Sequence, residues 1–266
     1  MELTFVTWNI RDGGTDAGDD ARLRRQMALL AAIRPSAVAI QECKHWDRDN
    51  YRTLHLAEHL LGMRGFLALS SHHGCHLAVF IREDAGLRVA EQRHELGHPY
   101  WHAVARVIAL ARGLPLHLVS AHLAPSSPAL CLIEAEAFGL IAKDGLVIAG
   151  GDWNAMPAAD PDPPLDGIDA GHARRKLDRS AARAIEEAGF TDVAAYLGNQ
   201  APTVGHTRAD TLAFRCDRVY STLPRAAITG YRVITEDPPT SDHRPVVATF
   251  DLASIPIGSA DLASRS

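Results

Sequence analysis

The sequence predicts one α/β domain in which two β-sheets pack together and helices cover them. Short apolar segments with the pattern of strands recur along the 266 residues, and amphipathic segments with helical spacing separate some of them. No linker or internal repeat divides the chain. Hydrophobic residues make up 47% of it and charged residues 22%, an ordinary globular composition that excludes a disordered, collagen-like or coiled-coil protein.

The N-terminal part predicts a strand, a helix, a second strand and a second helix. Residues 3–9 alternate and are rich in β-formers, and residues 21–33 carry apolar residues at helical spacing before Pro35. Residues 37–42 form a short apolar run that ends in polar residues. Residues 51–61 predict a helix that ends at Gly62.

The middle of the chain predicts an antiparallel meander. Strand-like segments follow one another at residues 66–69, 75–82, 87–92, 102–110 and 114–122. Turn-forming residues separate several of these segments, at 71–74, 83–86 and 112–113.

The C-terminal half predicts two helices and four strands. The helices are expected at residues 128–143 and 172–188, and the strands at residues 146–150, 214–220, 228–235 and 245–252. We expect residues 1–253 to form one domain. Residues 254–266 are small and polar without a pattern, so a flexible tail is expected there.

Charge and apolar content narrow the classes of partner. The chain carries 27 basic and 32 acidic residues, a net charge of −5, so any polyanion must be met by a local patch or a metal ion. Its longest apolar runs fall far short of the roughly 20 residues that cross a bilayer, so no membrane association is expected. The start of the chain lacks the pattern of a secretory signal, which favours a cytoplasmic location.

The cysteines do not suggest a disulfide framework or a zinc site. They are widely spaced, at Cys43, Cys75, Cys131 and Cys216, without a C-x-x-C pair. Disulfides are rare in the cytosol, so all four are expected to be reduced and three of them buried.

Polar residues gather at the ends of the predicted strands. The six clusters are Trp8-Asn9, Gln41-Glu42, Ser120-Ala121-His122, Gly151-Asp152-Trp153-Asn154, Cys216-Asp217-Arg218 and Ser241-Asp242-His243-Arg244-Pro245. One such cluster is typical of a cap or a turn. Six together indicate a functional site, because loops at one rim of a rigid sheet are where binding and catalytic residues concentrate.

The residue types in these clusters suit phosphoester chemistry. The carboxylates of Glu42, Asp152 and Asp242 and the amides of Asn9 and Asn154 offer the oxygen ligands that Mg²⁺ prefers. A phosphodiester is the natural substrate of such a site. His122 and His243 can serve as proton donor, base or electrostatic contact, and an imidazole needs a carboxylate to fix its tautomer. Asp217 is the candidate partner of His243.

Taken in order, the six clusters resemble the motifs of the endonuclease/exonuclease/phosphatase superfamily, which has the deoxyribonuclease-I-like fold. The resemblance covers residues 3–251. It implies a four-layered α/β/β/α sandwich with two central, mainly antiparallel sheets. It also implies a phosphoesterase site at one end that depends on Mg²⁺ or Mn²⁺.

The resemblance also implies a division of roles. Glu42 corresponds to the principal metal ligand, with Asn9 and Asp242 nearby. Asp152 would orient or deprotonate the attacking water, and Asn154 would hold the scissile phosphate. The remaining roles concern His243, which would stabilise the developing charge with Asp217 behind it, and His122, which is similar to the second histidine of the nuclease and sphingomyelinase branches.

The sequence departs from the family pattern at two places. In the deoxyribonuclease branch a glutamate on an earlier strand supports the first histidine, and Glu95 is the candidate for that role here. The tyrosine that abasic-site endonucleases place in this region has no convincing counterpart.

Three segments bear on the substrate. A cationic run at Arg174, Arg175, Lys176, Arg179 and Arg183 can track a phosphate backbone or form a solvated helix face paired with Glu186 and Glu187. The loop 44–52 mixes cations and aromatics, and its Trp46 can stack on a single strand or pack against the body. The histidine-rich segments 72–76 and 94–102 can line a pocket or bind a transition metal.

The expected function is a divalent-metal-dependent nuclease that cleaves DNA or RNA by in-line attack of an activated water. The alternative is a phosphodiesterase or phosphatase acting on a small-molecule or lipid phosphoester, with a deep pocket around Trp101, Trp153 and Arg215. A third class is a binding protein that has lost turnover. A groove open at both ends favours a polymer, and a closed cavity favours a small ester. No protein partner is implied, and a monomer is expected.

Overall fold

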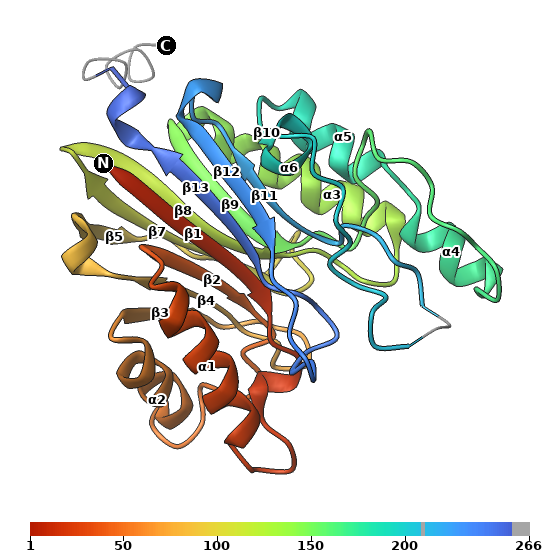
Figure 1. Cartoon of the computed structure of the whole chain (residues 1–266), viewed down its shortest axis with the longest axis horizontal. Coiled ribbons are helices and arrows are strands. Elements are labelled where there is room, and N and C mark those ends of the chain that lie inside the picture. Colours follow the sequence, from red (N-terminus) through yellow and green to blue (C-terminus); the bar gives the residue numbers. More distant parts are fainter. Residues whose placement is uncertain (209–210, 257–266) are drawn as a thin grey trace.

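The computed structural model describes residues 1–208 and 211–256 of the chain. Two sheets lie against each other in the centre, and helices cover the outer face of each (Figure 1). This arrangement confirms the predicted four-layered sandwich. Within the described residues, no helix is long and apolar enough to cross a membrane.

The first sheet has the strand order β12-β13-β1-β2-β4-β3. Its strands are β1 (Glu2–Asn9), β2 (Ala37–Gln41), β3 (Arg64–Ala68), β4 (Leu77–Ile81), β12 (Ile228–Val233) and β13 (Val246–Asp251). Neighbouring strands run antiparallel except for β1 and β2, which are parallel and are connected through α1 (Ala21–Ile33). Helix α1 and helix α2 (Arg52–Leu61) pack on this sheet through buried side chains such as Leu23, Met27 and Leu54.

The second sheet has the order β10-β11-β9-β8-β7-β5, with β6 paired to β7. Its strands are β5 (Leu87–Gln92), β6 (Glu95–Leu96), β7 (Ala103–Ala111), β8 (Leu114–His122), β9 (Leu146–Asp152), β10 (Thr191–Asp192) and β11 (Asp217–Ser221). The parallel pair here is β8 and β9, connected through α3 (Pro128–Gly139). The remaining helices are α4 (Ala170–Lys176), α5 (Ser180–Glu187) and α6 (Val193–Tyr196).

Short 3₁₀ turns complete the fold. They are η1 (Asp12–Gly14), η2 (Glu83–Ala85), η3 (Leu140–Asp144), η4 (Arg225–Ala227) and η5 (Leu252–Ser254).

The α-helix predicted at residues 128–143 ends at Gly139 and continues only as η3. The predicted tail begins at residue 254, but Ile255 is buried in the core, and residues 257–266 lie outside the described residues.

Two sequence predictions about the elements are wrong. The segment 66–122 is not one meander, because β3 and β4 pair in the first sheet whereas β5, β7 and β8 belong to the second. The segment 172–188 is not one helix. Helix α4 ends at Lys176, and the Asp178 carboxylate accepts the backbone N–H of Ser180 at 2.9 Å to start α5. Arg175, Arg179 and Arg183 therefore do not share one helix face.

Each sheet carries one parallel pair, and both pairs end at the same edge of the sandwich. Asn9 pairs with Gln41 at the end of β1 and β2, and His122 pairs with Asp152 at the end of β8 and β9. The side chains that follow two strands of each sheet are therefore brought to one place. This topology gathers the polar clusters that are far apart in the sequence.

The two sheets approach very closely behind this edge. A Cβ atom at Gly150 in β9 would lie 2.4 Å from the Cβ of Thr7 in β1, closer than real Cβ atoms come. Beside this contact, Gln41 Nε2 donates a hydrogen bond to Ser120 Oγ at 2.8 Å and so ties the sheets together. Glycine is required at position 150 by this close approach and not by its backbone angles.

Gly150→Ala is therefore expected to force the sheets apart. Overpacking of a rigid core costs about 1–3 kcal/mol, and thermal unfolding should show a fall in Tm of several degrees. Gly171→Ala is a matched control, because in helix α4 the added methyl group would meet only side-chain atoms, at 3.2 Å and beyond. A Tm for Gly150→Ala that equals that of the unaltered protein would contradict the close approach.

Candidate active site

The amide of Asn9 joins the strand ends of the two sheets. Its Nδ2 lies 3.0 Å from Glu42 Oε1 and 3.1 Å from Asp152 Oδ2, so one side chain donates to a carboxylate of each sheet. Asn9 is completely buried, and its Oδ1 accepts the backbone N–H of Arg11 at 3.0 Å. The structure thus brings three of the sequence-predicted residues together.

Glu42 is held by the turn that follows β1. It has a left-handed backbone conformation (φ 58°) directly after β2, which turns its side chain toward Asn9. Glu42 Oε2 accepts the backbone N–H of Asp12 at 2.9 Å, and its carbonyl oxygen accepts that of Gly13 at 2.8 Å. The carboxylate is therefore oriented before any ligand binds.

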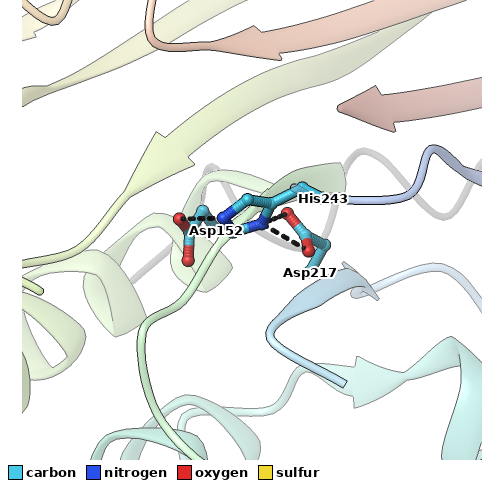
Figure 2. A group of neighbouring side chains, drawn as sticks. All are labelled: Asp152, Asp217 and His243. Carbon is cyan, nitrogen blue, oxygen red and sulfur yellow. Dashed lines mark hydrogen bonds and ion pairs between the residues drawn. The ribbon is translucent and has the colours of Figure 1, made fainter. Parts of the chain in front are cut away.

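A second group consists of Asp152, Asp217 and His243, and Figure 2 shows the imidazole between the two carboxylates. His243 Nδ1 lies 3.0 and 2.9 Å from the two oxygens of Asp217. Its Nε2 lies 3.8 Å from Asp152 Oδ2. Asp217 therefore fixes the ring, and the Nε2 edge is directed to Asp152.

The charges of this group follow from its burial. Burial disfavours the imidazolium, but the carboxylates of Asp217 and Asp152 outweigh it and raise the pKa of His243 to about 10. Burial alone would raise the pKa of Asp152, but the imidazoles of His243 and His122 hold it well below its ordinary value. At neutral pH the arrangement is an ionised carboxylate beside an imidazolium.

Asp152 has further partners that keep it in place. His122 Nε2 lies 3.3 Å from Asp152 Oδ2, and the thiol of Cys216 donates to Oδ1 at 3.0 Å. The Asp152 residue is only 3% exposed. A carboxylate that is buried, ionised and in contact with two imidazoles is positioned to accept a proton from a nearby water.

His122 is supported differently from the prediction. Glu95 lies 4.0 Å from Arg106 Nη1 in an ion pair and does not bond to His122. Among the residues that the structure describes, His122 Nδ1 has no partner. Instead, the ring of His102 stacks on it with the centroids 4.3 Å apart. Burial, and then His122 itself, lower the pKa of His102 to about 2, so the stacking ring is neutral.

Asn154, two residues after Asp152, is held in place by contacts of its own. It adopts a left-handed conformation (φ 49°), and its Nδ2 donates to the carbonyl oxygen of Leu123 at 3.0 Å. Its Oδ1 accepts a hydrogen bond from Lys176 Nζ, at the end of α4. The lysine thus brings a positive charge next to the amide that was predicted to hold the phosphate.

The carboxylate oxygens of Glu42 fit a hard divalent cation, whereas Asn9, also predicted as a ligand, directs its N–H group to Glu42 and its amide oxygen to the backbone N–H of Arg11. The Glu42 carboxylate is preoriented and partly exposed, as a ligand that shares its cation with water and phosphate should be. Asp242 lies apart from them, in a hollow that Glu42 does not line. In the described part of the chain, no group of three close ligand atoms unites Glu42 with Asp242.

The ligand atoms of Asp152, Asp217 and His243 are close enough to one another to hold a metal ion, but the protonated imidazole of His243 does not suit this role. The three ligand atoms lie within 4.8 Å of one another. However, an imidazole whose two nitrogens both carry protons has no free lone pair for a metal. The group is an imidazolium held by ion pairs between two carboxylates.

Two hollows meet at Asn154 and His243. The first hollow has a volume of about 460 Å³ and is also lined by Glu42, Trp101 and Asp152; we call it the Glu42 hollow. The second hollow has a volume of about 310 Å³ and is also lined by Lys176, Phe214 and Asp242; we call it the Lys176 hollow. The site is therefore a cleft that extends to both sides of Asn154 and His243.

The prediction that Trp46, Trp153 and Arg215 bind the substrate is wrong, because these three side chains lie in the interior. Trp46 and Trp153 are 0% exposed, and their indole N–H groups donate to the carbonyl oxygens of Gly13 and Arg218. Arg215 is 1% exposed and forms paired hydrogen bonds with Asp160 and Asp192. None of these three side chains can reach a substrate in the cleft.

Residues of both histidine-rich segments, among them His73 and His102, line the Glu42 hollow, as one of the two predicted roles requires. His76 pairs with Asp47 at 2.9 Å, and His94 accepts the backbone N–H of Arg106 at 3.1 Å. His102 stacks on His122, and His72 stacks on Trp101. In the described residues these histidines form no group of three potential metal ligands.

Sequence analysis did not single out several residues that shape the site. Lys176 was noted only as part of a cationic run, His102 as part of a histidine-rich segment, and Cys216 as the first residue of a strand-end cluster, without a role of its own. Their proximity comes from the pairing of β7, β8, β9 and β11. The four cysteines are free and three of them are buried, as predicted.

Glu134, which the sequence did not indicate as a site residue, connects two loops of the cleft. It lies in α3 and is 0% exposed. One carboxylate oxygen accepts the backbone N–H of Trp101, and the other accepts that of Ala124 at 2.6 Å. Burial raises the pKa of Glu134 to about 7, and the two N–H donors oppose this rise. A buried acid in the middle of an apolar helix face gives no signal of such a role in the sequence.

Comparisons with known proteins relate the whole chain to one family. A sequence model described as "Endonuclease/Exonuclease/phosphatase family" matches residues 6–243. A search of curated proteins found none with a similar sequence. The family match spans all six strand-end clusters up to His243.

Several solved structures are similar in fold. TDP2 from D. rerio, complexed with a single-strand DNA product, has a TM-score of 0.69 at 19% identity, with 94% of this chain and 99% of that chain covered. An AP endonuclease from Archaeoglobus fulgidus has a TM-score of 0.69 at 17% identity, with 94% and 100% covered. An endonuclease/exonuclease/phosphatase from Bacteroides vulgatus has a TM-score of 0.70 at 14% identity, with 94% and 99% covered.

Glu134→Gln is expected to change how stability depends on pH. The folded-state pKa of about 7 lies above the ordinary value of 4.5, so between these values the folded protein keeps a proton that the unfolded chain releases. The contribution of Glu134 to the free energy of unfolding therefore falls as the pH rises from about 4.5 to about 7, by up to roughly 3 kcal/mol. Glutamine has no such titration.

The measurement is urea unfolding of both proteins at pH 5 and pH 7.5. The stability of the variant relative to the unaltered protein should increase between the two pH values. A constant difference would show that Glu134 titrates alike in the folded and unfolded states.

Proposed function

The chain belongs to the endonuclease/exonuclease/phosphatase family, and from this premise we propose that it is a divalent-metal-dependent nuclease. It cleaves phosphodiester bonds of DNA or RNA by in-line attack of an activated water. The observation that carries this proposal is the buried, ionised Asp152, which contacts Asn9, His122 and His243 at the centre of an open cleft. The expected cytoplasmic location and monomeric state stay predictions.

In this proposal Asp152 orients the attacking water and takes its proton. Its low pKa keeps it ionised, and its contacts with two imidazoles and a thiol prevent it from turning away. Its Oδ2 atom faces His122 and His243. General-base assistance of this kind typically contributes 10²–10⁴-fold to a rate.

His243 and Asn154 act on the phosphoryl group. The imidazolium of His243, held by Asp217, presents Nε2–H to the developing negative charge, and the second N–H of the Asn154 amide is available to a phosphate oxygen. Lys176 adds positive charge at the same place. His122 supplies a further N–H at the edge of Asp152, with His102 packed against it.

Glu42 would hold the divalent cation, Mg²⁺ or Mn²⁺, and Asn9 would orient its carboxylate. When bound, the cation supplies positive charge to the phosphoryl oxygens, which is the main electrostatic demand of phosphoryl transfer. The protein's own contribution is to fix the carboxylate of Glu42 through Asn9 and the backbone N–H of Asp12. Asp242, which lines the Lys176 hollow, is the other proposed ligand.

The shape of the cleft supports a polymer over a small ester. The Glu42 hollow and the Lys176 hollow extend to either side of the reacting centre, as a strand that enters and leaves requires. Lys44 lines the first hollow and Lys176 the second, so each side offers a cation to a phosphate. The similar fold of TDP2 from D. rerio, which was solved with a single-strand DNA product, agrees with this choice.

Hydrolysis of a labelled panel tests the proposal. The panel contains single-stranded DNA, duplex DNA, RNA and bis-p-nitrophenyl phosphate, with Mg²⁺ or Mn²⁺ and with EDTA. We expect cleavage of at least one polymer, which is lost in EDTA. His243→Ala should reduce the rate by about 10²–10³-fold, because it removes an electrostatic contact to the transition state.

His59→Ala is the matched control, because His59 is exposed on α2 and lines neither hollow of the cleft. It should keep full activity, which guards against a general effect of histidine removal, whereas the loss of activity in His243→Ala guards against contaminating nuclease. Turnover of the small ester alone would favour the alternative, a phosphodiesterase for small-molecule or lipid phosphoesters. No turnover on any substrate with metal present would contradict an enzymatic function.

A further inference from the structure

Trp101 differs from the other three tryptophans of the chain. Trp8, Trp46 and Trp153 are 0% exposed and belong to the hydrophobic core. Trp101 is partly exposed and lines the Glu42 hollow together with Asp152 and Asn154. A large aromatic ring is thus available in the cleft, beside the groups that act on the phosphate.

The ring of Trp101 is supported by a second ring. His72 stacks on it with the centroids 3.9 Å apart and an interplanar angle of 23°. His72 does not line the hollow, whereas Trp101 does. The histidine therefore backs the indole, which limits its rotation and keeps its position in the wall of the cleft.

The backbone of Trp101 is fixed as well. Its N–H donates to the buried carboxylate of Glu134, which also holds Ala124 in the adjacent loop. The next residue, His102, is 3% exposed and stacks on His122. Trp101 is therefore rigidly placed relative to the reacting centre. The hydrogen bonds from the two loops compensate the burial of Glu134 and hold the loops together.

We propose that Trp101, backed by His72 and fixed by Glu134, is a stacking platform for one unpaired nucleobase of the substrate strand. This inference rests on the proposed nuclease function and adds the preference for a single-stranded segment at the Glu42 hollow. A base that stacks on an indole must be unpaired and turned out of a duplex. Stacking binds any base through its π-face, so the platform selects strand form and not sequence.

The test compares two fluorescein-labelled strands that carry the same number of phosphates. One is octathymidylate, and the other consists of eight abasic tetrahydrofuran units. Binding is measured by fluorescence anisotropy without added metal, so that the strands stay intact. We expect the unaltered protein to bind octathymidylate more tightly by on the order of tenfold, which is the contribution of about one stacked base.

Trp101→Ala should abolish the difference between the two strands, and Trp101→Phe should retain part of it. Tyr196→Ala is the matched control, because Tyr196 is an exposed aromatic residue on α6 that lines neither hollow, and it should retain the full difference. Thermal melting followed by circular dichroism establishes that each variant is folded. If Trp101→Ala does not fold, the comparison of Trp101→Phe and Glu134→Gln with the unaltered protein decides the question, since both should reduce the preference.

The outcomes separate the platform from the nuclease function. Equal affinity of the unaltered protein for the two strands, or an undiminished preference in folded Trp101→Ala, would overturn the platform and leave the nuclease proposal standing. If neither strand binds, the platform for an unpaired base is overturned, and the hydrolysis panel with duplex DNA and RNA decides the nuclease proposal separately.

Discussion

The close approach of β1 and β9 is the constraint on which the site depends. Because Gly150 has no side chain, Thr7 can pack directly against the backbone of the opposite sheet. At the ends of the same two strands, the amide of Asn9 then reaches both Glu42 and Asp152. A larger separation of the sheets would leave these carboxylates without a common donor, so packing in the core determines the geometry at the rim.

The electrostatics of the cleft follow from that proximity. Three carboxylates, the buried Asp152 and Asp217 and the partly exposed Glu42, stand close together, and each is compensated by a different kind of donor. Asp217 has the imidazolium of His243, Glu42 has backbone and amide N–H groups, and Asp152 has the imidazoles and a thiol. Only Glu42 lacks a full positive charge among these partners, which makes it the place where a cation would be bound.

Much of the fold and part of the site could be predicted from the sequence. Strand-end polar residues such as Asn9, Glu42 and Asp152 are recognisable because each follows an apolar run, and the parallel pairs carry them to one edge. The role of buried polar residues could not be predicted. Arg215 is bound by Asp160 and Asp192, which lie 55 and 23 residues away in the chain, and no local pattern distinguishes such a core ion pair from a substrate contact. In the same way, the stacking of His102 on His122 arises from the pairing of β7 and β8 and leaves no motif.

The central claim is that Glu42 holds a divalent cation beside the ionised Asp152. The most direct measurement is a titration of Mn²⁺ followed by electron paramagnetic resonance, on the unaltered protein and on Glu42→Gln, with Glu187→Gln on the exposed face of α5 as control. We expect Mn²⁺ to bind with an affinity that falls at least about tenfold in Glu42→Gln, as loss of a metal-binding contact does, and stays unchanged in Glu187→Gln. Equal affinity in the unaltered protein and Glu42→Gln would contradict it.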